Sequence, residues 1–413
     1  MISDADLSNF ALQYGTPLYV YSLPAMREAI WRLRRELPQP HRLYYSMKAN
    51  PHPEILRTAV NEGLYLEASS PPEASLALST SENVLATGPG KTDNSINRMI
   101  QAGVRRFTVE SPLEHKRLRG VARQSGVPVG FLVRLNAPDD ARASWKMGGQ
   151  ASQFGVDLRQ TELLSSVCRS DDWAKFQGFQ LFSASNIFDT ESLVMSITSS
   201  VRAAAEAASL ASVTVSELDL GGGFPAPFGQ RAVAPNLSGL GDKVSDELDI
   251  NFPGWRIGSP VVSFESGRAV SASAGTLLTT VQDRKSSRGR EFAVLDSGIN
   301  HLAGMSGTGR SLLPRLSPRT IHETKLAKRE PFEGDLVGSL CTPADVLVRR
   351  IAIEELGVGD ILAFDNVGAY GLTASLIGFL GHDSPVELAV DGERVGATRL
   401  SLGRGKAGAL HED

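Results

Sequence analysis

The sequence has little cysteine and histidine, the residues that build disulfide frameworks and many metal centres. Cys168 and Cys341 are the two cysteines, and seven histidines occur among the 413 residues. Two cysteines cannot form a disulfide framework for a chain of this length, which indicates a reducing, cytoplasmic compartment. Neither a CxxC nor an HxxxH spacing is present, so the sequence predicts no metal site.

Long apolar runs and an excess of charge are missing too. No stretch of 18 apolar residues occurs, and a membrane-spanning helix needs such a stretch. The first residues, MISDADLSNFALQYG, lack the apolar centre of a signal peptide. Lys and Arg total 42 and Asp and Glu total 46, a formal net charge of −4. This balance argues against a nucleic-acid-binding face and against a polybasic membrane surface.

Short apolar segments alternate with amphipathic ones over roughly the first two thirds of the chain. This alternation favours parallel βαβ units, and eight such units within about 230 residues are typical of a (β/α)8 barrel. The expected barrel strands are 42–46, 64–68, 83–87, 106–109, 129–135, 178–182, 215–220 and 260–265. The predicted fold class is therefore α/β, with a TIM-like barrel as its larger part.

After Arg268 the pattern changes to strand-like segments without long helices between them, which favours a mainly antiparallel β domain. The segment TPLYVYS, at 16–22, is strand-like as well and could pair with this C-terminal sheet. We therefore expect a barrel at 27–270 and a β domain at 1–26 and 271–413. The Pro- and Gly-rich stretch 226–255 is expected to be irregular, and the charged stretch 315–333 to be an exposed loop.

Lys48, in YYSMKANP, follows the first expected barrel strand. Catalytic residues of barrels gather at the carboxyl ends of the strands, and a lysine flanked by apolar and small residues there can lose its charge readily. A neutral amine can form a Schiff base with an aldehyde. Position alone leaves open the alternative of a surface lysine without a chemical role.

Glycine is abundant, with 40 residues, and three of them are adjacent at Gly221–Gly223 after an expected strand. Adjacent glycines let backbone N–H groups reach a phosphate. A Rossmann turn is the rival interpretation, but Pro225 and Pro227 would break the helix that such a turn requires. A flexible turn without a ligand remains the other alternative.

Glu265 and Arg268, in FESGR, end the eighth expected strand. A carboxylate there could hold a protonated pyridine nitrogen and the arginine could bind a phosphate, or the two could form a structural ion pair. Cys341, in GSLCTPADVL, and Tyr370, in NVGAYGL, are further candidates. A lone cysteine is more often a small core residue than a proton donor; Cys168 is interpreted in that way.

Together these motifs resemble the fold type III pyridoxal-phosphate decarboxylases, which include diaminopimelate, ornithine and arginine decarboxylases and share their architecture with alanine racemases. The matching segments cover nearly the whole chain in the family's order and are YVYS, YSMKAN, LEASSPPEASLAL, TGPGK, FLVRLN, LDLGGGFP, FESGR, GSLCTPADVL and NVGAYGL. The resemblance implies an eight-stranded barrel joined to a β domain, pyridoxal 5′-phosphate as cofactor, and a head-to-tail homodimer with shared active sites.

The resemblance also implies roles for single residues. Lys48 matches the lysine that binds the cofactor's aldehyde, Glu265 the acid on the pyridine nitrogen, and Cys341 the proton donor that reaches into the partner's site. The residues that match cofactor contacts are Glu67, Arg134, Phe182, Ser185, Gly222, Gly223, Gly267, Arg268 and Tyr370. Those that match substrate contacts or their neighbours are Arg310, Thr342 and Asp345. Alanine racemases place an arginine against the nitrogen, so the acid here favours decarboxylation.

Two positions depart from the family's pattern. Phe182 aligns with a histidine that stacks on the cofactor ring in most of these decarboxylases; a phenyl ring can stack but offers no hydrogen bond. Thr342 follows Cys341 where the family usually has an acid that engages a distal ammonium group. Loss of that counter-charge would cost roughly 2–5 kcal/mol for a buried partner, which argues against a simple diamino acid. Arg310, in GTGRSLLP, could bind a carboxylate or carbonyl instead.

The combination of KMGG, QFG, ESGR, CTPADVL, GAYGL and FLGH is most similar to the branch that includes the butirosin-pathway decarboxylase of carrier-bound glutamate and relatives in siderophore and other secondary-metabolite pathways. We therefore expect a decarboxylase of specialised biosynthesis that acts on a small-molecule or carrier-protein-tethered amino acid. Three alternatives stay open: a diaminopimelate-type decarboxylase of lysine biosynthesis, a catalytically silent regulatory paralogue, and a racemase.

Overall fold

The structure, a computed structural model, describes residues 2–136, 145–146, 152–303, 316–324 and 328–403. The chain divides into two compact units. The barrel unit comprises Leu23–Pro227 and Ala232–Ala274, and the β unit comprises Met1–Ser22, Phe228–Arg231 and Gly275–Asp413. The expected barrel range 27–270 begins and ends inside the barrel unit, but its short piece Phe228–Arg231 groups with the β unit instead.

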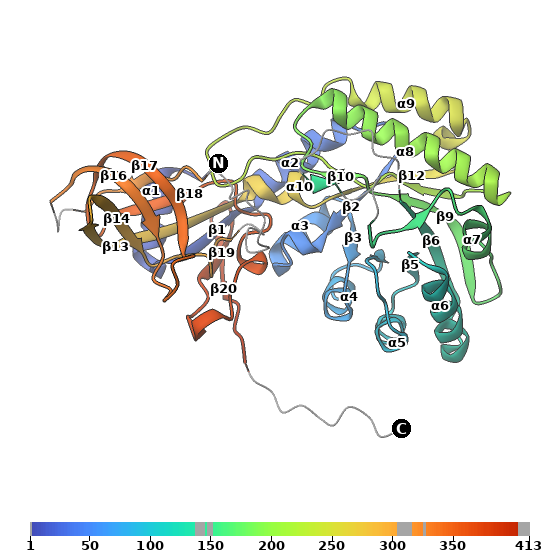
Figure 1. The fold of residues 1–413 in the computed structure, drawn as a ribbon, viewed down its shortest axis with the longest axis horizontal. Helices are drawn as coiled ribbons and strands as arrows, with labels where there is room; N and C mark the ends of the chain where they lie inside the picture. Colours follow the sequence, from blue (N-terminus) through green and yellow to red (C-terminus); the bar gives the residue numbers. More distant parts are fainter. Residues whose placement is uncertain (1, 137–144, 147–151, 304–315, 325–327, 404–413) are drawn as a thin grey trace. The chain divides into compact units, whose positions relative to one another are not determined.

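Eight parallel strands close into a barrel in the order β2-β3-β4-β5-β6-β9-β11-β12, with β12 paired back to β2 (Figure 1). They are β2 (Arg42–Ser46), β3 (Tyr65–Ala68), β4 (Val84–Ala86), β5 (Arg106–Val109), β6 (Val129–Asn136), β9 (Ala174–Leu181), β11 (Glu217–Asp219) and β12 (Val261–Ser266). Two further pairings involve short strands: β8 (Val156–Asp157) joins β6, and β7 (Trp145–Lys146) joins β10 (Ala184–Ser185). The predicted barrel is confirmed.

Helices cover the outside of the barrel strands (Figure 1). They are α2 (Leu23–Glu36), α3 (Pro53–Asn61), α4 (Pro71–Leu78), α5 (Asp93–Ala102), α6 (Pro112–Ser125), α7 (Thr161–Val167), α8 (Thr190–Ala211) and α9 (Leu240–Asn251), with the short α10 (Arg268–Ser271) and the 3-10 turns η1 (Met47–Ala49), η2 (Trp255–Ile257) and η3 (Ala272–Ala274). The starts of α4 and α6 are fixed by Ser70 and Ser111, whose hydroxyls accept backbone N–H groups of the first helical turn. Each then begins with proline, which suits that position.

The barrel strands are buried on both faces. Tyr44, Phe107, Phe131, Phe179 and Phe264 are each less than 2% exposed. Parallel strands enclosed in this way appear in a sequence as almost continuous apolar runs rather than as alternating ones. This burial explains why the eight strands were predictable from the sequence.

The β unit contains a nine-stranded sheet in which β17-β16-β14-β13-β1-β19-β20 are successive neighbours and β18 pairs with β13 and β15. The strands are β1 (Leu18–Ser22), β13 (Gly275–Ser287), β14 (Arg290–Leu295), β15 (Arg319–His322), β16 (Glu330–Val337), β17 (Val346–Leu356), β18 (Ile361–Phe364), β19 (Val386–Asp391) and β20 (Arg394–Arg399). Neighbours are antiparallel except β1–β19 and β14–β16. The expected pairing of the N-terminal strand with the C-terminal sheet is confirmed.

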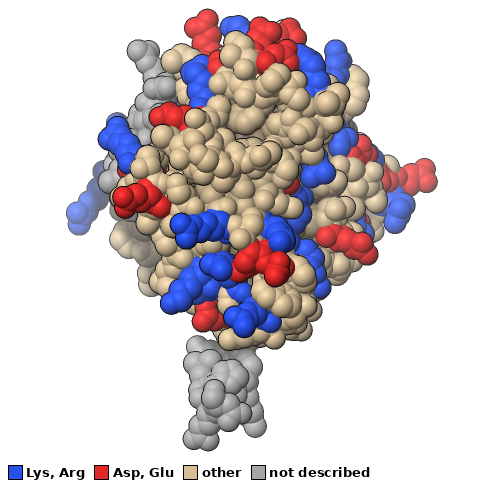
Figure 2. Space-filling view, turned by 90° about the vertical axis from the view of Figure 1, so that its right-hand side faces the viewer, with Lys and Arg blue, Asp and Glu red and all other residues tan. Residues whose placement is uncertain are grey.

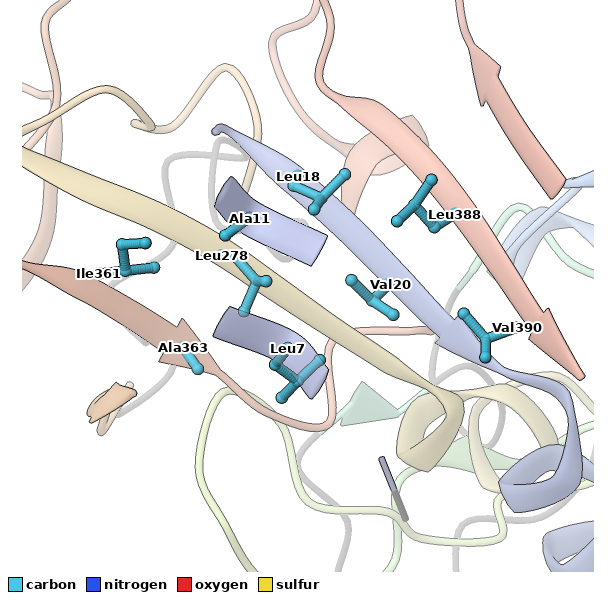
Figure 3. Close-up of a cluster of buried hydrophobic side chains, with 9 residues drawn as sticks. All are labelled: Leu7, Ala11, Leu18, Val20, Leu278, Ile361, Ala363, Leu388 and Val390. Atoms are coloured by element: carbon cyan, nitrogen blue, oxygen red, sulfur yellow. The ribbon is translucent and has the colours of Figure 1, made fainter. Parts of the chain in front are cut away.

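A compact apolar cluster holds helix α1 (Asp4–Tyr14) against this sheet (Figure 3). Leu7 and Ala11, four residues apart on one face of α1, meet side chains from β1, β13, β18 and β19. The strand members of the cluster are Leu18, Val20, Leu278, Ile361, Ala363, Leu388 and Val390. Full burial of a leucine-sized side chain stabilises a fold by about 1.5–3 kcal/mol, so this cluster is a main support of the β unit.

Two expectations about irregular segments are wrong. The stretch 226–255 contains α9, whose buried Leu240, Val244 and Leu248 repeat every four residues on one helix face. The stretch 315–333 contains β15 and the start of β16, which pair with β18 and β17. The exposed edge strand β20, which sequence reasoning missed, pairs with β19. Backbone pairing stabilises these strands without an apolar pattern that could reveal them.

No helix among the described residues combines the length and the apolar character needed to cross a bilayer. On the face shown in Figure 2, basic and acidic side chains lie interspersed. Several basic side chains gather below the centre of that face, with acidic ones among them.

Candidate active site

Candidate residues from the sequence meet at the carboxyl ends of the barrel strands. They lie in the last residues of a barrel strand or in the segment that follows it, and they are Lys48, Glu67, Arg134, Phe182, Ser185, Gly222, Gly223, Glu265, Gly267 and Arg268. Barrel enzymes build their active sites at this end because the loops that follow the strands converge there. The barrel unit thus gathers ten of the candidates in one region.

Lys48 forms an ion pair with Glu67. Its Nζ lies 3.3 Å from Oε1 of Glu67, and the lysine side chain is 43% exposed while the glutamate side chain is 2% exposed. Ser46 donates a hydrogen bond to Oε2 of Glu67, and Thr87 donates one of 2.6 Å to Oε1. Burial raises the pKa of Glu67, but the Lys48 ammonium and these hydrogen bonds outweigh burial and hold the pKa below its usual value. Glu67 therefore holds the Lys48 amine in place, while the lysine side chain stays accessible to solvent.

Glu265 is a buried carboxyl group on β12, 2% exposed. Gln180 donates a hydrogen bond of 2.6 Å from Nε2 to its Oε1. Burial and the charge of Glu67 raise the pKa of Glu265 to about 7, against the opposing effects of Lys48, Gln180 and Arg134. An acid with such a pKa can change its protonation state near neutral pH, and a cation placed beside it would favour the carboxylate.

The turn Gly221–Gly223 is fastened to strand β12 and leaves no room for side chains. Oδ1 of the buried Asp219 accepts the Gly221 N–H at 2.9 Å, and the Gly221 carbonyl accepts the Glu265 N–H at 2.6 Å. A Cβ on Gly222 would lie 2.2 Å from the Glu265 carbonyl oxygen. The backbone at this turn is consequently bare, which is what close approach of a phosphate requires.

Gly223 and Gly267 extend the same cradle. Gly223 has a φ of +96°, and a Cβ there would lie 2.8 Å from the Ala184 carbonyl oxygen, next to Ser185 on β10. A Cβ on Gly267 would lie 2.6 Å from the Cβ of Ala49, in the turn that carries Lys48. These contacts bring the segments after β9, β11 and β12 and the Lys48 turn close to one another.

Phe182, directly after β9, packs at the same place. Its ring lies 5.9 Å from Lys48 Nζ, and its Cδ2 lies 2.9 Å from the position that a Cβ on Gly221 would occupy. An aromatic face therefore lies between the amine and the glycine turn. This arrangement suits a flat ring bound against it.

Arg134, on β6, is held by a buried carboxylate that the sequence did not reveal. Its Nη1 donates to Oε1 of Glu110 at 3.2 Å, and Oε2 of Glu110 accepts the Gly155 N–H at 3.1 Å. The Arg134 guanidinium also lies 4.5 Å from the centre of the Phe154 ring. Glu110 thus fixes both the arginine and the segment that begins β8.

The remaining candidates belong to the β unit. Cys341 is exposed, and Tyr370 has a φ of +55°, unusual for a residue other than glycine. Thr342 accepts the Ala344 N–H at its hydroxyl, at 3.3 Å. Asp345 is 3% exposed, and both of its carboxylate oxygens accept backbone N–H groups. Arg310 lies outside the described residues.

Cys168 differs from Cys341 in its surroundings. It is 3% exposed, at the end of α7. Burial raises its pKa to about 12. This thiol is therefore not a nucleophile near neutral pH, whereas the exposed Cys341 is accessible to reagents.

Sequence reasoning missed Thr87, Glu110, Gln180 and Asp219. Three of them have a positional signal: Thr87 and Glu110 directly follow β4 and β5, and Asp219 ends β11. Polar residues at the carboxyl end of a barrel strand are candidates on that ground alone. Gln180 lies two residues before Phe182, so the alternation of side chains along a strand could have indicated that both face the same way.

Comparisons with known proteins agree with this geometry. Residues 23–272 match the family described as "Pyridoxal-dependent decarboxylase, pyridoxal binding domain". The chain is 28% identical to L-glutamyl-(BtrI acyl-carrier protein) decarboxylase of Niallia circulans, over 98% of this chain and 95% of that one. It is 27% identical to diaminopimelate decarboxylase of Methanothermobacter thermautotrophicus, over 91% and 87% of the two chains.

A solved structure shows the same fold. Diaminopimelate decarboxylase from Helicobacter pylori, complexed with L-lysine, superposes with a TM-score of 0.81 at 21% identity and covers 95% of this chain and 96% of that one. The family match spans more than half of the chain and includes every barrel residue named above. The chain therefore belongs to the pyridoxal-dependent decarboxylases, enzymes that remove CO2 from amino acids with pyridoxal phosphate as cofactor.

Proposed function

We propose that this enzyme decarboxylates an amino-acid derivative in specialised biosynthesis, and that the substrate carries no free ammonium group at its distal end. A carrier-bound amino acid, such as an aminoacyl thioester, fits this description. One observation carries the proposal: the turn of the β unit that contains Cys341 offers no available carboxylate.

The barrel residues fit pyridoxal phosphate. The amine of Lys48 would bond to the aldehyde, the buried Glu265 would face the pyridine nitrogen, and Phe182 would stack on the ring. The bare backbone of Gly222 and Gly223 suits the phosphate group, because side chains at these positions would collide with carbonyl oxygens. The further phosphate contacts are proposed to be Ser185, Gly267, Arg268 and Tyr370, with Glu67 and Arg134 as neighbours of the ring.

The bound cofactor supplies an electron sink for the charge that remains on the substrate when CO2 leaves. Glu265 would act as a carboxylate that stabilises the proton on the ring nitrogen, since a cation beside this acid would lower its pKa from about 7. Phe182 would restrict the ring without exchanging a proton. The Sγ–H of Cys341 would return a proton to the substrate carbon.

Thr342 and Asp345 support the substrate assignment. The turn 338–345 has one acidic residue, Asp345, whose two oxygens already accept the N–H groups of Ile299 and Leu340 at 2.8 Å. Thr342, directly after Cys341, is neutral. A distal ammonium group would find no counter-charge in this turn, at a cost of roughly 2–5 kcal/mol if it were buried. We infer that Asp345 holds the turn and that Arg310 remains the proposed contact for a distal carbonyl or carboxylate.

The relatives support both the proposal and its main rival. The Niallia circulans relative is named for a glutamyl group on an acyl-carrier protein, a substrate whose distal end is a thioester. The Methanothermobacter relative is named for diaminopimelate, which ends in an ammonium and a carboxylate. The neutral Thr342 favours the first kind of substrate.

Release of CO2 from a panel of substrates tests this proposal. Purified enzyme with pyridoxal phosphate is given meso-diaminopimelate, L-ornithine, L-glutamate and a glutamyl thioester of pantetheine or of a carrier protein. We expect turnover of the thioester and at least about 30-fold lower kcat/KM for the diamino acids, as a lost charge contact of this size predicts. Efficient turnover of meso-diaminopimelate would overturn the assignment.

Variants at Thr342 sharpen the comparison. Thr342→Glu supplies the missing carboxylate and is expected to raise kcat/KM for ornithine, whereas the neutral Thr342→Gln is not. Two other classes of function give distinct results. A regulatory paralogue would lack the visible absorbance of lysine-bound cofactor, and a racemase would interconvert L- and D-amino acids without releasing CO2.

We further propose that the enzyme is a homodimer with shared sites, in which one protomer supplies Lys48 and its partner supplies Cys341. The two residues belong to different units of the chain. An exposed thiol on the β unit is available for such a contact.

A further inference from the structure

The turn that carries Cys341, residues 338–345, is closed on itself by Asp345. This turn connects the antiparallel strands β16 and β17. Oδ2 of Asp345 accepts the Leu340 N–H at 2.8 Å, and the Asp345 carbonyl accepts the Gly338 N–H at 3.1 Å. The Thr342 carbonyl accepts the Asp345 N–H at 3.2 Å. Cys341 therefore lies within a ring of hydrogen bonds that begins and ends at one aspartate.

The same carboxylate reaches a second loop, residues 298–303, which follows β14. Oδ1 of Asp345 accepts the Ile299 N–H at 2.8 Å. A Cβ on Gly298 would lie 2.3 Å from Oδ1, and one on Gly338 would lie 2.3 Å from Oδ2. The two loops approach this carboxylate so closely that only glycine fits on either side. Hydrogen bonds to an ionised acceptor are stronger than those between neutral groups.

The 298–303 loop is bound in turn to the segment 371–376, which follows Tyr370. The Ile299 carbonyl accepts the Leu376 N–H at 3.2 Å, and the Ser375 hydroxyl accepts the Ala303 N–H at 2.9 Å. Ser375 donates its own hydroxyl to the Gly371 carbonyl at 2.7 Å. A continuous path of hydrogen bonds thus leads from the Cys341 turn to the residue next to Tyr370.

We propose that Asp345 is a positioning residue that couples the Cys341 turn to the Tyr370 segment through the 298–303 loop. The proton donor and the phosphate contact of the β unit then keep a fixed distance from each other. The assignment of Cys341 and Tyr370 to the active site rests on the proposed function, whereas the coupling rests on the hydrogen bonds alone. The test therefore uses readouts that need no turnover.

Asp345→Asn is the principal variant, because an amide can accept one of the two N–H groups but must turn its own NH2 toward the other. Asp360→Asn is the matched control. Asp360 is also fully buried in the β unit, and its carboxylate accepts the Thr324 and Gly357 N–H groups at 2.8 Å each. It also joins two loops, at the far end of β17 from the Cys341 turn, and in addition it pairs with Arg329, whose Nε lies 3.1 Å from its Oδ2.

Two measurements on the cofactor-loaded enzyme test whether the Cys341 turn and the Tyr370 segment are coupled. A thiol reagent reports on Cys341, because Cys168 is buried and its pKa is about 12. Hydrogen exchange reports on the amides of 298–303 and 371–376. We expect Asp345→Asn to change the Cys341 labelling rate about tenfold and to speed exchange in both segments about tenfold, as loss of a charged hydrogen bond predicts. Asp360→Asn should leave all three readouts unchanged.

Gly298→Ala is a second variant in case Asp345→Asn does not fold, since it disturbs the same contact and keeps the carboxylate. For Gly298→Ala we expect the same faster hydrogen exchange at 371–376. If hydrogen exchange at 371–376 is unchanged in a folded variant, the coupling is overturned. If Asp360→Asn speeds exchange in the same segments as much as Asp345→Asn does, the effect is one of general stability and the coupling is overturned as well. Failure of the proposed function would appear separately, as absence of CO2 release from every substrate by the unaltered enzyme.

Discussion

Gln180 and Glu265 are joined by a hydrogen bond of 2.6 Å from the amide Nε2 to the carboxyl Oε1, and both side chains are 2% exposed. The bond lowers the pKa of Glu265, yet burial still raises it to about 7. Without a cation beside it, this acid is therefore costly to ionise. Under the proposed function, the charge of this group serves only the bound cofactor.

Glu265→Gln should stabilise the cofactor-free protein at alkaline pH while abolishing turnover. The folded-state pKa is about 7 and the ordinary value is 4.5, so the folded protein binds more protons between these values. The stability of the wild type consequently falls as pH rises through this window. We expect the variant to gain about 3 kcal/mol in free energy of unfolding at pH 8, by the size of the shift. Chemical denaturation at several pH values measures the difference in free energy of unfolding between variant and wild type. This difference should vanish near pH 4.5. A difference that stays constant with pH would contradict the prediction.

Gly222→Ala should weaken cofactor binding through a steric collision. The added Cβ would lie 2.2 Å from the Glu265 carbonyl oxygen, so the glycine turn or β12 must move. A cost of about 1–3 kcal/mol in stability is typical of such overpacking, and cofactor affinity should fall with it. Gly120→Ala is the control, because Gly120 is exposed in α6 with nothing within 4 Å of the added Cβ. That change should stabilise the protein by about 0.5–1 kcal/mol and leave cofactor titrations unaltered.

Lys48→Ala and Lys48→Arg separate the two tasks of this lysine. Both should abolish the visible absorbance of lysine-bound cofactor and the release of CO2. Lys48→Ala also leaves the buried Glu67 without its cation. We therefore expect Lys48→Ala to lose about 1 kcal/mol more in free energy of unfolding than Lys48→Arg. The figure is modest because the lysine is partly exposed. Absorbance spectra and denaturation curves check the two effects; surviving absorbance and turnover in Lys48→Ala would refute the role of the amine.

Mixed dimers test whether sites are shared. Lys48→Ala and Cys341→Ala should each be nearly inactive alone, and Cys341→Ala should still bind cofactor. After random exchange of protomers, half of the dimers carry one of each, and one site in each mixed dimer regains both groups. About a quarter of the wild-type activity is then expected from this symmetry. A mixture of Lys48→Ala and Lys48→Arg serves as the control, and no recovery after confirmed exchange would rule out shared sites.

The barrel was predictable because its signals are local and repeated. Buried parallel strands leave apolar runs, and residues such as Lys48 and Glu265 stand directly at their ends. Gln180 and Glu110 were not predictable in the same way, because their roles depend on neighbours far along the chain: Gln180 meets Glu265, and Glu110 meets Gly155. A sequence shows which residues end a strand but not which side chains of different strands meet.

The missed elements have a different cause. In α9 the apolar repeat was present, but the prolines and glycines around it suggested an irregular chain. The six residues of β20 are all exposed, so no apolar alternation marks the strand. Its formation depends on backbone hydrogen bonds to β19, and every residue type except proline can donate such a bond.

The place of β1 in the β unit has a consequence for biosynthesis on the ribosome. Leu18 pairs with Leu278 of β13 on one side and with Val386 of β19 on the other. Both partners leave the ribosome only after the barrel residues, which lie between them and Leu18 in the chain. The N-terminal strand must therefore wait, with its edges unpaired, while the entire barrel is synthesised. The β unit can therefore close around β1 only after the barrel residues have been synthesised, and until then both edges of this apolar strand stay unpaired.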